Sequence, residues 1–106
     1  MLSIVAPVYN EQAVLAEFVR RLTAALEEVG DHEIVLVDDG STDGSWDVLL
    51  LLAASTPRLR LVRLSRNFGH QAALSAGLDA ARGEAIVSID ADLQDPPELI
   101  PDLVAK

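Results

Sequence analysis

Short apolar runs alternate along the chain with longer segments in which apolar residues recur every three or four positions. A run of about four to eight apolar residues fits a buried β-strand, and the wider spacing is typical of an amphipathic helix. The runs predict strands at residues 2–6, 33–38, 59–65 and 86–89. The periodic segments predict helices over residues 11–29, 45–56, 70–82 and 97–106.

Capping and breaking residues mark the expected ends of these elements. Pro7 is expected to end the first strand. Asn10 is a favourable N-cap and Glu11 places negative charge in a first turn, so the first helix is expected to begin there. Gly30 supplies the C-terminal stop of this helix. Residues 59–65 alternate between apolar and charged, which predicts a strand near an edge of the sheet.

The strand–helix alternation predicts the α/β class. Helices that connect parallel strands pack on both faces of the sheet through right-handed crossovers. We therefore expect a three-layer α/β/α sandwich with a mostly parallel sheet. The 106 residues suffice for one compact domain, so residues 1–106 are expected to form a single unit.

Composition restricts the classes of partner. The formal net charge of −9 argues against nonspecific binding to nucleic acid or to an anionic membrane surface. The absence of cysteine excludes disulfides and thiolate metal sites. No apolar run approaches the roughly 20 residues of a membrane span. These properties predict a soluble, cytosolic globular piece.

Unusual polar residues gather where the predicted strands end. In open parallel sheets, ligands bind beyond the carboxyl ends of the strands. The polar residues at these ends lie in the segments 7–11, 38–41, 65–67 and 90–92. The sequence therefore predicts one binding site along a single rim of the sheet.

Asp90 and Asp92 are the strongest candidates for a metal site. Residues two apart in an extended chain point the same way, and Gln94 continues the row. Two carboxylates and an amide oxygen are ligands that suit Mg²⁺ or Mn²⁺. A polar turn after a strand is the competing interpretation of this spacing.

For other residues of the rim, the sequence gives weaker evidence of a role in binding. At least one of Asp38 and Asp39 is expected to cap the following helix or stabilise the turn after the strand. Asp39 is favoured as the residue that contacts a base N–H or a ribose hydroxyl. Tyr9 could face a base or simply pack. Arg66 could bind a phosphate or be a solvated surface arginine. His70 opens a helix and receives little weight as a base.

The sequence lacks the signature motifs of several other classes of protein. The chain contains no Gly-x-Gly-x-x-Gly turn, no phosphate-binding loop ending in Gly-Lys-Ser/Thr and no Gly-x-Ser-x-Gly elbow. A receiver-type signalling domain would carry its acidic pair after the first strand, whereas Asp38 and Asp39 follow the second. The one lysine is Lys106, in the last predicted helix rather than at a strand end.

Four motifs together resemble family 2 glycosyltransferases of the GT-A fold. They are the segments 7–11, 37–45, 65–71 and 90–98. The last two resemble in particular the polyprenyl-phosphate branch, which includes dolichyl-phosphate mannosyltransferase-like enzymes and bacterial bactoprenol glucosyltransferases. The resemblance covers nearly the whole chain in order.

The resemblance implies a reaction and a set of site residues. The reaction is the inverting transfer of a hexose from a UDP- or GDP-sugar to dolichyl or undecaprenyl phosphate, with Mg²⁺ or Mn²⁺, in cell-envelope glycan synthesis. The implied nucleotide-sugar-binding residues are Pro7, Tyr9, Asn10, Glu11, Asp39, Asp90, Ala91 and Asp92. The implied metal-binding residues are Asp90, Asp92 and Gln94.

Catalytic domains of this family are longer than this chain. We therefore expect the nucleotide-sugar-binding half, with acceptor and catalytic residues beyond Lys106 and the full-length protein at the inner face of the membrane. The alternative is a non-catalytic nucleotide-binding or interaction module. An open sheet edge in such a half predicts self-association into a homo-oligomer.

Overall fold

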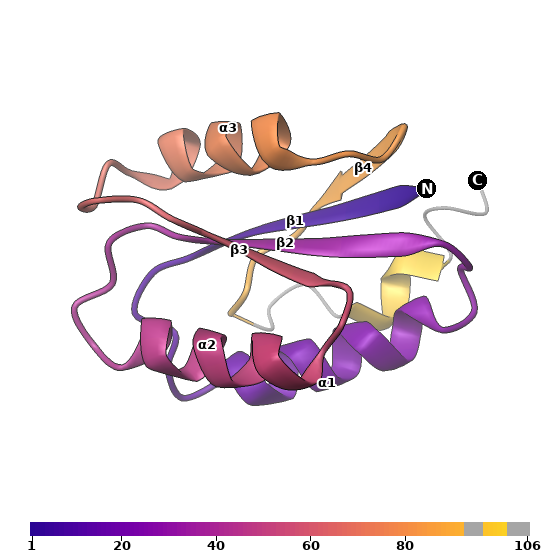
Figure 1. Ribbon diagram of the computed structural model, residues 1–106, viewed down its shortest axis with the longest axis horizontal. Helices are drawn as coiled ribbons and strands as arrows, with labels where there is room; N and C mark the ends of the chain where they lie inside the picture. Colours follow the sequence, from indigo (N-terminus) through magenta and orange to yellow (C-terminus); the bar gives the residue numbers. More distant parts are fainter. Residues whose placement is uncertain (93–96, 102–106) are drawn as a thin grey trace.

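The computed structural model describes residues 1–92 and 97–101 and confirms the alternation of strands and helices (Figure 1). In chain order the elements are β1 (Leu2–Val8), α1 (Leu15–Leu26), β2 (His32–Asp38), α2 (Ser45–Ser55), β3 (Leu59–Arg63), α3 (His70–Ala80), β4 (Ala85–Ser88) and the short 3₁₀ helix η1 (Pro97–Leu99). Of the predicted last helix, residues 102–106 lie outside the described residues, as does Gln94.

The four strands form one parallel sheet in the order β3-β2-β1-β4. Helices α1 and α2 cover one face and α3 covers the other, which gives the three layers expected (Figure 1). Because all four strands run the same way, their carboxyl ends meet at one rim. The prediction that residues 59–65 lie near an edge is also confirmed, since β3 is the outermost strand beside β2.

Alternate residues of the central strands build two separate cores. Ile4 and Leu36 point toward α1 and α2, where they pack with Phe18 in the larger cluster. Val5 belongs to a smaller cluster beneath α3. There a Cβ at Gly77 would lie 2.3 Å from Val5 Cγ1, so α3 approaches the sheet closely only because this position is glycine. The buried centre of the sheet gives the rim a rigid base.

The predicted start of the first helix was wrong. Helix α1 begins at Leu15 rather than at residue 11, and Val14 occupies its N-cap position. Asn10 instead has a left-handed backbone with φ of 52°. Its side-chain oxygen accepts hydrogen bonds from backbone amides of the loop after β2, so it is not available to cap its own helix.

The predicted end of the first strand was also wrong. Strand β1 continues through Pro7 to Val8. The pairing of β1 with β4 stops at Val5. From Ala6 to Val8, β1 pairs only with β2 within the described sheet. Proline is tolerated where one side of a strand makes no ladder bonds.

Strand β4 is not the buried strand that its sequence predicted. Ala85, Ile86 and Ser88 are exposed, and Ile86 keeps 42% of its surface. Within residues 1–92 and 97–101, β4 pairs with β1 alone. In the same residues, no helix combines the length and the apolar character that crossing a membrane requires.

Candidate functional site

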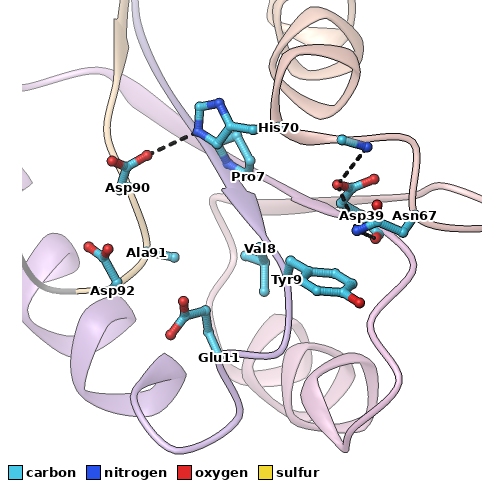
Figure 2. A pocket seen from close by; sticks show the side chains of 11 residues that line it. Pro7, Val8, Tyr9, Glu11, Asp39, Asn67, His70, Asp90, Ala91 and Asp92 are labelled. Carbon is cyan, nitrogen blue, oxygen red and sulfur yellow. Dashed lines mark hydrogen bonds and ion pairs between the residues drawn. The ribbon is translucent and has the colours of Figure 1, made fainter.

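The carboxyl ends of β1, β2 and β4 and the segment before α3 enclose a cavity of about 300 Å³ (Figure 2). Seven of the eight residues predicted to bind a nucleotide sugar line this cavity: Pro7, Tyr9, Glu11, Asp39, Asp90, Ala91 and Asp92. They come from three strand ends that are far apart in the sequence. Among the described residues, Val8, Asn67, Gly69 and His70 also line it.

Asn10 is the predicted site residue that does not line the cavity. Its Oδ1 accepts a hydrogen bond from the Thr42 backbone amide at 2.8 Å and another from Asp43 N at 3.3 Å. Its own backbone amide donates to Ser41 Oγ at 3.0 Å. Asn10 therefore holds the turn after β1 against the loop after β2, and its side chain supports the rim from outside the cavity.

Asp39 lies at the end of β2 with only 3% of its surface exposed. Its Oδ1 accepts a hydrogen bond from Phe68 N at 2.9 Å, and its Oδ2 accepts one from Gly69 N at 3.1 Å. Asn67 Nδ2 donates to the same Oδ2 at 3.3 Å. The carboxylate thus binds the loop before α3 at the wall of the cavity.

Asp38 performs the turn role that one of the two adjacent aspartates was expected to have. It is fully buried and is not part of the cavity wall. Its Oδ1 accepts a hydrogen bond from Ser41 N at 3.3 Å, and its Oδ2 lies 3.9 Å from Arg63 Nε. Asp39 rather than Asp38 faces the cavity.

His70 is a cavity residue to which the sequence gave little weight. It is the first residue of α3, and its Nε2 lies 3.1 Å from Asp90 Oδ1 at the end of β4 (Figure 2). Its position in the sequence could have indicated this role, because His70 follows a glycine and begins the helix after the predicted rim segment 65–67. Arg66, considered for phosphate binding, stacks on the Phe68 ring at 4.6 Å and does not line this cavity.

Glu11 and Asp92 give one side of the cavity a concentrated negative charge. Burial raises the pKa of the Glu11 carboxyl, and the negative charges of Asp92 and Asp43 raise it further. In Figure 2 the Glu11 side chain extends toward the side of the cavity that holds Asp92. Repelling carboxylates of this kind suit a hard cation, whose charge would relieve the repulsion.

The described residues alone do not complete a metal site. Among residues 1–92 and 97–101, no group of three or more His, Asp or Glu side chains is arranged to hold an ion. Gln94, the third predicted ligand, lies outside this part of the chain. Asp90 and Asp92 nevertheless both line the cavity, and their oxygen donors are of the type that Mg²⁺ and Mn²⁺ prefer.

Comparison with known proteins points to one family. The sequence model described as "Glycosyl transferase family 2" matches residues 3–106. The chain is 49% identical over 105 residues to "Uncharacterized glycosyltransferase YkcC" of Bacillus subtilis (strain 168). It is 53% identical over 107 residues to "Undecaprenyl-phosphate 4-deoxy-4-formamido-L-arabinose transferase" of Enterobacter sp. (strain 638). Each match covers 98% of this chain and 32% of the relative, so the chain spans about a third of these proteins.

Solved structures show the same fold. The mannosyltransferase PcManGT of Pyrobaculum calidifontis, in complex with GDP-Man and Mn²⁺, superposes with a TM-score of 0.79 at 31% identity, over 86% of this chain and 27% of that one. Residues 1–349 of TarS from S. aureus, in complex with UDP-GlcNAc, superpose with a TM-score of 0.78 at 25% identity, over 98% and 30%. The architecture is that of GT-A glycosyltransferases.

Proposed function

Because the chain belongs to glycosyl transferase family 2, we propose that it is the donor-binding part of a glycosyltransferase. Its cavity takes a nucleoside diphosphate sugar at the carboxyl ends of the strands. The observation that carries the proposal is that seven residues, assigned to the nucleotide from sequence motifs alone, line one cavity. Two structural relatives whose complexes contain GDP-Man and UDP-GlcNAc support the same class of donor.

The residues of the cavity suggest how the donor is oriented. Tyr9 and Asp39 lie together on one side (Figure 2), where an aromatic face and a carboxylate suit a base and a ribose. Asp90 and Asp92 lie on the other side, where the diphosphate would follow. The nucleotide would therefore extend along the rim from the end of β2 to the end of β4.

A divalent cation fits the acidic side of the cavity. Asp90, Asp92 and Gln94 would hold Mg²⁺ or Mn²⁺. The pKa of Glu11 is raised first by burial and then by the negative charges of Asp92 and Asp43, which a cation would offset. Bound there, the ion would neutralise the diphosphate and make it a better leaving group. The Mn²⁺ in the PcManGT complex supports this choice of metal.

We propose a polyprenyl phosphate as the acceptor and inversion as the stereochemical outcome. The name of the Enterobacter relative, an undecaprenyl-phosphate transferase, supports this acceptor class. A phosphate oxygen is already anionic, so positioning and electrostatics can drive the transfer without a strong general base. The full-length protein would then act at the inner face of the membrane in cell-envelope glycan synthesis, with acceptor residues in the part of its relatives that this chain does not match.

Isothermal titration calorimetry with UDP, GDP and their sugars, each with and without Mn²⁺, tests the donor proposal. We expect one nucleotide class to bind in a metal-dependent manner. Asp92→Asn should remove the metal-dependent part of the binding, whereas Asp47→Asn, an equal change of charge at an exposed position of α2, should not. A folded chain that binds no nucleoside diphosphate under any metal condition would contradict the proposal.

A non-catalytic nucleotide-binding module is the second candidate. The observation that favours it is that the chain matches only about a third of its curated relatives. Transfer of radiolabelled sugar to a polyprenyl phosphate by the 106-residue chain would rule out the module. Nucleotide binding without transfer is expected both of a module and of a donor-binding part that lacks its acceptor residues, so it supports donor binding alone.

A further inference from the structure

A series of hydrogen bonds runs through the loop between β3 and α3 and joins the two sides of the cavity. On one side, the Asp39 carboxylate accepts hydrogen bonds from the backbone amides of Phe68 and Gly69 at 2.9 and 3.1 Å. The next residue is His70, which begins α3. On the other side, His70 Nε2 is hydrogen-bonded to Asp90 Oδ1 at 3.1 Å. Figure 2 shows the contact between His70 and Asp90 at the cavity wall, with Asp39 on the other side of the cavity.

We propose that this loop sets the position of the Asp90 carboxylate relative to Asp39. In this arrangement Asp39 is a positioning residue for the start of α3, and His70 is a positioning residue for Asp90. The inference rests on the proposed function in one respect, since it assigns the loop to a cavity that takes a nucleotide. The hydrogen bonds of the path do not depend on that assignment.

Helix α3 has no side-chain cap of its own. Its N-cap residue is Gly69, with φ of 105° and no side chain to accept a hydrogen bond. The first amides of a helix need acceptors from outside it. Asp39 supplies an acceptor from the neighbouring strand β2 to Gly69 N and to Phe68 N just before it. A buried carboxylate that accepts two backbone hydrogen bonds holds such a turn firmly.

The loop before α3 also lies directly against the residues that follow β2. Gly40 has φ of 68°, and a Cβ at this position would lie 2.2 Å from Arg66 C and 2.3 Å from Asn67 N. The absence of a side chain therefore lets the two backbones touch. Asn67 Nδ2 adds a hydrogen bond to the Asp39 backbone oxygen at 3.3 Å. The loop is thus held against Asp39 and Gly40, directly after β2, by contacts of four successive residues, 66–69.

The pair of His70 and Asp90 forms the exposed end of the path. The side chains of His70 and Asp90 keep 60% and 52% of their surface, and an exposed pair of this kind is weak when neither partner is held in place. Because Asp39 fixes the start of α3, the His70 ring is presented to Asp90 at a defined place. Hydrogen bonds of this type orient carboxylates that bind metals and ligands. Loss of the Asp39 hydrogen bonds should therefore change the position of the Asp90 carboxylate.

NMR on the ligand-free chain tests this directly. In Asp39→Asn, an amide NH₂ replaces one acceptor, so we expect hydrogen exchange at Phe68 N or Gly69 N to accelerate about tenfold or more. The side-chain carboxyl ¹³C resonance of Asp90 should shift in the same variant. Asp79→Asn, an exposed site on α3, is the matched control and should change neither signal. An Asp90 resonance that stays unchanged while the loop amides lose protection would overturn the inference.

His70 variants keep the test decisive if Asp39→Asn does not fold. His70→Ala should shift the Asp90 resonance while leaving the Phe68 and Gly69 amides protected, because it breaks the path beyond the loop. His70→Gln retains an amide donor and should restore most of the wild-type resonance. An Asp90 signal identical in wild type and His70→Ala overturns the proposal.

Binding measurements connect the path to the nucleotide. For nucleoside diphosphate with Mn²⁺, His70→Ala should lower the affinity about tenfold in the wild-type background and much less in the Asp39→Asn background. Equal losses in both backgrounds would overturn the coupling. If no nucleotide binds but the Asp90 resonance responds to Asp39→Asn, the proposed function fails and the positioning path stands.

Discussion

Gly40 is the residue whose missing side chain lets the backbones of two rim loops touch. Its φ of 68° lies in the left-handed region, which L side chains adopt at a cost. The atoms that a Cβ would meet are backbone atoms of Arg66 and Asn67, which cannot rotate away. A substitution here must therefore move the loop as well as strain the turn.

We expect Gly40→Ala to destabilise the chain by about 3 kcal/mol or more, through the combined cost of the backbone conformation and the steric overlap. Gly30→Ala is the matched control. Gly30 also has a positive φ, of 92°, but nothing lies within 4 Å of its Cβ position. Only the conformational cost of about 1 kcal/mol should remain there. Urea unfolding of both variants measures the difference, and equal losses would show that the contact with the loop is unimportant.

Glu11 is expected to oppose folding of the ligand-free chain. Its pKa is raised by burial and then by Asp92 and Asp43, so its ionised form is unfavourable in the cavity. Glu11→Gln should therefore raise the stability of the free protein, by up to about 1 kcal/mol, and lower the affinity for Mn²⁺ with nucleoside diphosphate. Thermal unfolding with and without ligand tests both effects. Glu28→Gln, an exposed carboxylate away from the cavity, should change neither.

For individual residues, the sequence indicated correctly most of the side chains that line the cavity. It did not indicate which partners these side chains contact. Asp39 and Asp92 could be placed from motifs because strand ends of a parallel sheet converge. Asn10 does not line the cavity, because its left-handed backbone and its hydrogen bond to the Thr42 amide turn its side chain toward the next loop, and that tertiary contact has no local sequence pattern. The partnership of His70 with Asp90 joins elements 20 residues apart and has no local pattern.

Among the elements, Glu33 of β2 connects three neighbours at the end of the sheet opposite the cavity. Its Oε2 accepts hydrogen bonds from Ser3 Oγ of β1 and from Arg82 N after α3, both at 2.6 Å. Its Oε1 accepts one from Arg60 Nη1 of β3 at 2.7 Å. Arg60 also donates to the Ala80 carbonyl at 2.9 Å, so this cluster holds the C-terminal end of α3.

These contacts predict how stability depends on pH. Burial alone would raise the pKa of Glu33, but hydrogen bonds from Ser3, the Arg82 amide and Arg60 outweigh it and lower the pKa from 4.5 to about 2. The unfolded chain therefore takes up the proton at a higher pH than the folded chain. The stabilisation by ionised Glu33 is present above pH 4.5 and is lost as the pH falls toward 2.

Glu33→Gln should cost on the order of 3 kcal/mol at pH 7, and its difference from wild type should narrow as the pH falls below 4.5. Urea unfolding from pH 7 to pH 2 measures both quantities. Glu27→Gln provides an exposed glutamate as the control, with a small effect at every pH. A difference for Glu33→Gln that is independent of pH would mean that packing, rather than the ionised carboxylate, accounts for the loss.

The type and order of the elements could be predicted because the apolar period changes clearly between strands and helices. Their boundaries followed tertiary contacts instead. Strand β1 passes through Pro7 because β2 continues to pair with it, and α1 starts late because Asn10 binds another loop. The exposure of β4 could not be inferred from its composition, since a strand of Ala, Ile and Val has the same sequence pattern at a centre or an edge.

For the whole molecule, the two outer strands of the sheet differ in how they are protected. Strand β3 carries Arg60 and Arg63, and charged side chains on an edge discourage pairing with other chains. Strand β4 carries no charged residue and no proline, and Ile86 is exposed on it. Within the described part of the chain, nothing pairs with its outer side. The β4 edge is therefore the surface at which a second strand can add.

We predict that the 106-residue chain self-associates through this edge, with β4 of one copy paired to β4 of another. An antiparallel pair of identical strands would place Glu84 opposite Ile89 and Asp90 opposite Gly83, so no like charges face each other. The net charge of −9 opposes association at long range, so added NaCl should strengthen it. Sedimentation velocity over a concentration series should show that Ile86→Lys restores the monomer. Leu51→Lys is the control, since Leu51 is 74% exposed on α2, away from the β4 edge. If Leu51→Lys dissociated the oligomer as fully as Ile86→Lys, general surface hydrophobicity rather than strand pairing would be responsible.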